Sequence, residues 1–148
     1  MQNWIFLIVA VILGTIMPTQ AAINNKLSIH LSNPILAALT SFLVGSVTLL
    51  LYCLFNGTPL TNLGQIKNVP PSALLGGFIG AIYVACVSFL VPRLGVALLF
   101  SIIVAGQMLT TLFLDHYGVF GVPIREVSLP RVLGILLIIG GVILVRKF

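Results

Sequence analysis

Five apolar stretches, each about as long as a bilayer is thick, most constrain what this chain can fold into. A helix rises about 1.5 Å per residue, so about 20 apolar residues cross the roughly 30 Å of bilayer hydrocarbon. The stretches cover residues 4–28, 34–55, 71–91, 94–115 and 129–147. The sequence therefore predicts an all-α integral membrane protein, with five transmembrane helices in a single domain over residues 1–148.

The composition supports the same class. The 148 residues are 59% hydrophobic and 6% charged, and the mean hydropathy is +1.24. A soluble domain of this length leaves too much surface exposed to hide so many apolar side chains. The net charge of +5 comes from basic residues scattered near the ends of the predicted helices. That distribution is typical of membrane topology signals, so we expect a lipid bilayer around the chain and no nucleic-acid partner.

The residues needed for enzyme chemistry are scarce. Asp115 and Glu126 are the only acids, and no glycine-rich loop precedes a Lys and a Ser or Thr. Cys53 and Cys86 lie inside apolar stretches without metal-ligand spacing, so they are interpreted as small hydrophobic residues. The sequence therefore predicts no enzyme, no cofactor and no metal site.

The first stretch changes character at Pro18. A proline inside a helix removes one backbone hydrogen bond, so a kink is expected there. Gln20, Asn24 and Asn25 follow, and the first two are four residues apart and share a helix face. A cleavable signal peptide is the alternative, but the amino terminus MQN lacks the basic residues that such peptides carry.

Polar side chains at bilayer depth are the candidate solute-binding residues. A buried amide such as Gln107, roughly 20 Å along the fourth stretch, needs partners for two donors and a carbonyl. The alternative is that it only joins two helices, because such bonds contribute about 0.6–2 kcal/mol. For Asn24 and Asn25 the favoured alternative is that they are ordinary interfacial polar residues, and Tyr83 could pair with a neighbouring carbonyl. The candidate set is Gln20, Asn24, Tyr83 and Gln107.

Two further features have competing interpretations. Asp115 and His116 form a candidate proton relay, because histidine titrates near neutral pH. The alternative is a solvated helix end.

In the last stretch, Gly134, Gly140 and Gly141 form a smooth surface of the kind that lets membrane helices approach closely.

The basic residues give almost no preferred orientation. With five spans, one side carries Lys67, Arg125 and Arg131, and the other carries Lys26, Arg93, Arg146 and Lys147. The positive-inside rule compares these counts, and three against four is nearly balanced. A balanced chain can insert in both orientations, and two opposed copies can pair about an axis in the membrane plane. We therefore hypothesise dual topology and an antiparallel homodimer.

An ordered set of short motifs carries a family resemblance. The motifs are QAAIN at 20–24, ALTSFLVG at 38–45, VPRLG at 91–95, AGQ at 105–107, DHYG at 115–118 and GILLI at 134–138. Over nearly its whole length the chain resembles the YdcZ-type five-span proteins of the drug/metabolite transporter superfamily. The last stretch is also similar to the dimerising helix of small multidrug resistance proteins. The resemblance implies half of a ten-helix unit in the bacterial inner membrane, and it implies no particular substrate.

The chain departs from the small multidrug resistance proteins at one point. Those proteins carry a glutamate in the first helix that binds cations and couples them to protons. The first stretch of this chain holds no acid. The resemblance therefore does not extend to cation export by a glutamate mechanism.

Two functions follow as hypotheses. The first is a transporter, or half of one, that moves a small polar or amphipathic solute by alternating access, paired with an inverted copy or a paralogous subunit. Its pocket would be lined by Gln20, Asn24, Tyr83 and Gln107, and its dimer seam by Gly134, Gly140 and Gly141. The alternative is a non-transporting subunit that stabilises or regulates a partner. If the amides and Tyr83 converge on one cavity, the transporter is favoured. If they instead hydrogen-bond to separate backbone carbonyls, the non-transporting subunit is favoured.

Overall fold

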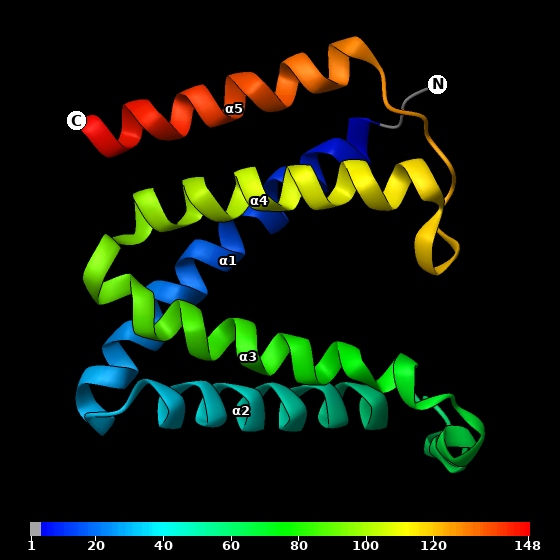
Figure 1. Cartoon of the computed structure of the whole chain (residues 1–148). Helices are drawn as coiled ribbons and strands as arrows, with labels where there is room; N and C mark the ends of the chain where they lie inside the picture. Colours follow the sequence, from blue (N-terminus) through cyan, green and yellow to red (C-terminus); the bar gives the residue numbers. More distant parts are fainter. Residues whose placement is uncertain (1–3) are drawn as a thin grey trace. The chain divides into compact units, whose positions relative to one another are not determined.

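The computed structural model describes residues 4–148, which form helices and connecting segments with no strand among them (Figure 1). The long helices are α1 (Trp4–Leu31), α2 (Pro34–Phe55), α3 (Pro71–Leu94), α4 (Val96–Tyr117) and α5 (Leu129–Lys147). The short 3₁₀ helices are η1 (Leu60–Asn68) and η2 (Val119–Gly121). The five long helices of this described part have the length and apolar composition to cross a membrane, which confirms the predicted fold class.

Three helices end beyond the predicted positions, namely α1, α3 and α4. α1 continues to Leu31 instead of residue 28, and it ends where Ser32 adopts a φ of 50°. α3 continues through Pro92 to Leu94, because a proline in a last turn costs one hydrogen bond and leaves the helical path intact. The break before α4 is Gly95, whose φ of 75° is accessible to glycine at little cost. α4 accordingly runs over 96–117 instead of 94–115.

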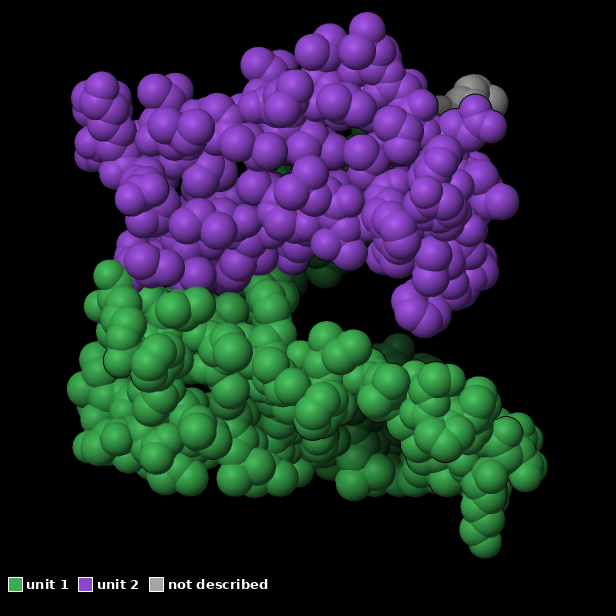
Figure 2. All heavy atoms as spheres, viewed as in Figure 1, with its two compact units in different colours: residues 1–93 green, residues 94–148 purple. Residues whose placement is uncertain are grey.

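The chain divides into two compact units, residues 1–93 and 94–148, which Figure 2 colours separately. Unit 1 contains α1, α2, η1 and α3, and unit 2 contains α4, η2 and α5. The prediction of a single five-helix domain concerns the arrangement of both units, and it stays a prediction.

In unit 1, α1 and α2 pack against each other through small residues. Ala21 on α1 and Ala37 and Ala38 on α2 are buried, and small side chains of this kind let helix backbones approach closely. Asn33 starts α2, because its Oδ1 accepts hydrogen bonds from the backbone N–H groups of Ile35 (2.8 Å) and Leu36 (3.2 Å). This cap and Pro34 at the first helical position are the local reason why α2 begins where the sequence predicts.

In unit 2, α4 and α5 form the packed pair. The α4 side of their contact is lined by Ala97, Ser101, Val104, Met108 and Thr111, and the α5 side by Gly134, Ile135, Ile138, Gly141 and Val142. Each of the five spans buries at most 17% of its most apolar window inside the described chain. Most apolar side chains therefore face outward, as expected of helices surrounded by lipid or by another membrane subunit.

Candidate functional site

A hollow of about 380 Å³ between α1 and α2 holds the largest group of polar side chains that the sequence singled out. We call it the polar hollow. Its lining residues are Thr15, Ile16, Thr19, Gln20, Ile23, Asn24 and Ser41. All except Ser41 lie on α1, at spacings that place them on one face of that helix. Two of the predicted solute-binding residues, Gln20 and Asn24, therefore lie together.

Asn24 anchors the polar hollow. It is 2% exposed, and its Oδ1 accepts a hydrogen bond of 2.7 Å from the Ser41 hydroxyl on α2. A buried carbonyl without a donor would be costly, so this bond holds the asparagine in a defined orientation. Among residues 4–148, the amide nitrogen of Asn24 makes no side-chain hydrogen bond, and Asn24 is one of the residues that line the hollow.

Gln20 and two threonines supply the other polar groups. Gln20 is exposed and makes no hydrogen bond among residues 4–148. The Thr15 hydroxyl donates to the Ile12 carbonyl (2.7 Å), and the Thr19 hydroxyl donates to the Thr15 carbonyl (2.8 Å). Each hydroxyl oxygen keeps lone pairs that can accept a further hydrogen bond. The hollow therefore offers both donors and acceptors.

The polar hollow carries no charge. Asp115 and Glu126, the two acids of the sequence, both lie outside unit 1, and none of the lining residues is basic. An uncharged set of amides and hydroxyls suits a neutral hydrogen-bonding group, and the apolar rim of Ile16 and Ile23 suits a hydrocarbon portion. The arrangement can bind, but it holds no group that would perform acid–base or nucleophilic chemistry.

The hollow lies near the middle of α1. This helix has 28 residues, so it is about 42 Å long and exceeds the hydrocarbon thickness of a bilayer. Gln20 is roughly 4 Å from the helix midpoint along the axis. An amide in the hydrocarbon of a bilayer is far from the water that would otherwise pair with it.

Pro18 lies within the stretch of α1 that lines the polar hollow, directly before Thr19. α1 is one continuous helix on both sides of it, although Pro18 has no N–H to donate to the Gly14 carbonyl. The proline therefore frees a carbonyl without unwinding the helix. A bend of the axis at Pro18 stays a prediction.

Tyr83 and Gln107 do not line the polar hollow. The Tyr83 hydroxyl on α3 is buried and has no hydrogen-bond partner in the described part of the chain, and the same holds for the fully buried Ser88. Gln107 on α4 belongs to unit 2, is exposed, and makes no hydrogen bond within residues 4–148. The convergence of these two residues with Gln20 and Asn24 stays a prediction.

Asp115 and His116 contact different groups at the end of α4. Asp115 Oδ2 pairs with Arg131 Nη2 at 2.9 Å, and His116 Nδ1 accepts from the Val127 N–H at 3.4 Å. Arg131 also donates to the Arg125 carbonyl at 3.1 Å, and the Arg125 N–H donates to the Asp115 carbonyl at 2.8 Å. These bonds fasten the segment between α4 and α5 to both helix ends. The proton relay stays a prediction.

The three glycines of α5 lie on two faces. Gly134 and Gly141 line hollows of about 260 Å³ and 490 Å³ between α4 and α5, together with Ile138. Gly140 is two residues past Ile138, about 200° around the helix, and is exposed. Of the predicted dimer seam, only Gly140 therefore lies on the face away from α4, and the seam itself stays a prediction.

Sequence reasoning overlooked three contributors to the polar hollow, Thr15, Thr19 and the bonding role of Ser41. The threonines lie five and one residues before Gln20, so extending the helix face of Gln20 and Asn24 backwards would have found them. Nothing in the sequence marks Ser41 as the partner of Asn24. Within residues 4–148, no group of three or more His, Cys, Asp or Glu side chains could hold a metal ion.

Comparison with known proteins agrees with the resemblance found in the motifs. A family model described as "Putative inner membrane exporter, YdcZ" matches residues 5–144. No curated protein and no solved structure matches the chain. That description names an exporter, which supports a role in transport, and the five spans fit a multi-pass inner-membrane protein. The chain belongs to the YdcZ family.

Proposed function

We propose that this protein is half of a transporter that moves a small neutral solute, polar or amphipathic, by alternating access as an antiparallel homodimer. The polar hollow is then the part of the solute site that each copy contributes. The observation that carries the proposal is the uncharged cluster of Gln20, Asn24 and the Thr15 and Thr19 hydroxyls near the middle of α1.

The Gln20 amide needs a hydrogen-bond partner inside the membrane. An unpaired amide costs several kcal/mol in hydrocarbon, so a membrane helix that exposes one needs a partner for it. Among the residues that the structure describes, no group hydrogen-bonds to the Gln20 side chain. A solute or water molecule in the polar hollow would satisfy it, and the Asn24 N–H donors would face the same ligand.

The dimer is supported by the outer face of α5. Leu129, Leu133, Leu136 and Ile143 are exposed on the same side as Gly140. A Cβ added to Gly140 would meet no atom of residues 4–148 within 4 Å, so the face is both apolar and smooth. Such a surface fits a helix of a second copy, and the balanced distribution of basic residues allows that copy to be inverted. Two copies would supply ten helices, the number implied by the likeness to drug/metabolite transporters.

One observation favours the alternative of a non-transporting subunit. The Ser41–Asn24 hydrogen bond joins α1 to α2, which is what an amide does when it serves only to hold helices together. The alternative does not account for Gln20, whose amide has no such partner in the described chain.

A thermal-shift screen of the purified protein against neutral metabolites tests the proposal. We expect at least one solute to raise the melting temperature, and Gln20→Leu to abolish that shift. The control is Gln65→Leu, which makes the same change in η1, outside the predicted spans. A solute that stabilises the Gln20→Leu variant as strongly as the unchanged protein would contradict the assignment of the polar hollow.

A further inference from the structure

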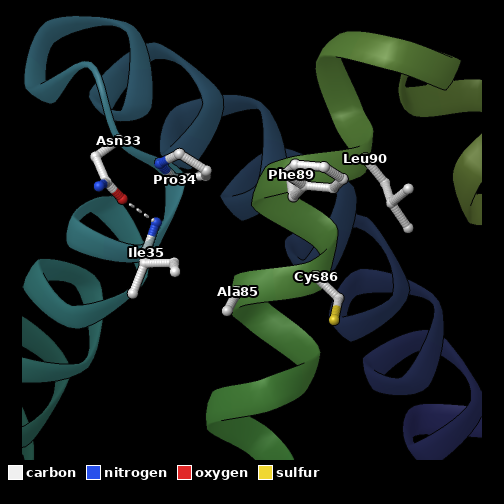
Figure 3. A pocket seen from close by; sticks show the side chains of 7 residues that line it. All are labelled: Asn33, Pro34, Ile35, Ala85, Cys86, Phe89 and Leu90. Atoms are coloured by element: carbon white, nitrogen blue, oxygen red, sulfur yellow. Dashed lines mark hydrogen bonds between the residues drawn. The ribbon is translucent and has the colours of Figure 1, made fainter.

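A second hollow, of about 480 Å³, lies where the turn between α1 and α2 faces α3 (Figure 3). We call it the turn groove. One wall is formed by residues 33–35 at the start of α2, and the other by side chains of the last turns of α3. Its lining residues are Asn33, Pro34, Ile35, Ala85, Cys86, Phe89 and Leu90. Its volume falls in the range of about 300–1,000 Å³ that ligand sites occupy, and it shares no residue with the polar hollow.

A guanidinium group lies beside the turn groove. Arg93 is the penultimate residue of α3, and its Cζ lies 3.5 Å above the ring centroid of Phe89, which lines the groove. Arg93 Nη1 also donates to the Phe89 carbonyl. A guanidinium has five N–H donors, and within residues 4–148 no other hydrogen bond to Arg93 is formed. The ring and the carbonyl therefore orient Arg93 while most of its donors stay free.

Unit 1 contains no anion that could neutralise Arg93. The acids of the sequence are Asp115 and Glu126, both in unit 2, and Asp115 is already paired with Arg131. On the opposite wall, Asn33 Oδ1 is occupied by the backbone N–H groups that it caps, which leaves its amide N–H donors available. The turn groove thus has the neutral donors of Asn33 in its wall and the cation of Arg93 stacked on its lining residue Phe89.

We propose that the turn groove binds an anionic phospholipid, with one acyl chain between the α2 start and α3 and the phosphate at Arg93. The bilayer supplies this ligand at high concentration, and a lipid combines a hydrocarbon chain with an anion at the membrane surface. The groove offers the same two parts, a mainly apolar lining and a cation near a helix terminus that stacks on the lining residue Phe89. Basic sites between membrane helices recognise anionic head groups in this way. The inference does not depend on what the protein transports.

The groove contains its own chemical reporter. Cys86 lines it and is exposed, and Cys53→Ser leaves Cys86 as the one remaining thiol. The delipidated full-length variant in detergent is titrated with phosphatidylglycerol or with phosphatidylcholine of identical acyl chains, and maleimide labelling of Cys86 is followed. We expect phosphatidylglycerol to halve the labelling rate at a concentration about fivefold lower than phosphatidylcholine needs. One Arg near a membrane surface changes anionic-lipid binding by about that factor. Native mass spectrometry should then show one retained phosphatidylglycerol per chain.

Matched variants separate the charge from the groove. Arg93→Gln should remove the preference for phosphatidylglycerol and Arg93→Lys should keep it, while Lys67→Gln removes the same charge from η1 and should change nothing. Equal protection by both lipids in the Cys53→Ser protein, or a preference that survives Arg93→Gln, would overturn the proposal. Protection that rises with protein concentration in the absence of lipid would overturn it too, because a second copy would then cover the groove.

Discussion

The Asn24–Ser41 hydrogen bond allows a quantitative test of how α1 and α2 are held together. The 2.7 Å bond joins a side chain that is 2% exposed to a hydroxyl on the neighbouring helix. Ser41→Ala leaves the buried Asn24 carbonyl without its donor. Asn24→Ala leaves Ser41 free to donate to the carbonyl four residues earlier, as Thr40, Thr48 and Ser101 already do in this chain. The bond should therefore matter mainly through Asn24.

Bonds of this kind between membrane helices contribute about 0.6 kcal/mol on average and up to roughly 1.7 kcal/mol. Because this one is buried, we expect a coupling energy of about 1 kcal/mol between Ser41→Ala and Asn24→Ala, or roughly a fivefold change in the unfolding equilibrium. The assay is a double-mutant cycle of unfolding in mixed micelles with increasing denaturing detergent. Thr48→Ala is the control, because Thr48 donates only to Val44 of its own helix.

The result that would refute this reasoning is a coupling energy below about 0.3 kcal/mol, which is the usual error of additivity. A Thr48→Ala variant as destabilised as Ser41→Ala would refute it as well, because the loss would then come from any hydroxyl on α2. Either outcome would mean that Asn24 does not fasten the two helices.

Three further predictions concern the other unit and the assembly. Gly140→Leu should weaken self-association measured by crosslinking while the chain still folds, and Gly76→Leu, also without Cβ neighbours, should not. Asp115→Asn should cost at most about 1 kcal/mol, because its ion pair is one-third exposed. Asp115→Asn should nevertheless speed backbone hydrogen exchange in segment 118–128, whereas the control Glu126→Gln should not. Unchanged exchange in Asp115→Asn would contradict the role of Asp115 in fastening this segment. Carboxy-terminal reporters active on opposite sides of the membrane should both give signals, and a signal from one alone would end the dual-orientation hypothesis.

The five helices and the membrane class could be predicted from the sequence because the transfer of apolar residues into lipid is a property of each stretch by itself. The start of α2 at Pro34 and of α5 at Leu129 was also predictable, since proline at the first helical turn acts locally. The ends of α1 and α3 were less predictable. Proline can stop a helix or lie in its last turn, and Pro92 does the latter, whereas the glycine at position 95 was the available signal for the end of α3.

The sequence also determined that Gln20 and Asn24 share a helix face, because the period of a helix is fixed by its hydrogen bonds. Only the tertiary structure decided that this face turns toward Ser41, that Asp115 pairs with Arg131, and that Gly140 alone of the α5 glycines faces away from α4. The physical reason is the bilayer. Inserting apolar helices into lipid constrains each one separately, whereas the faces that meet are chosen by close packing and hydrogen bonds between residues distant in sequence.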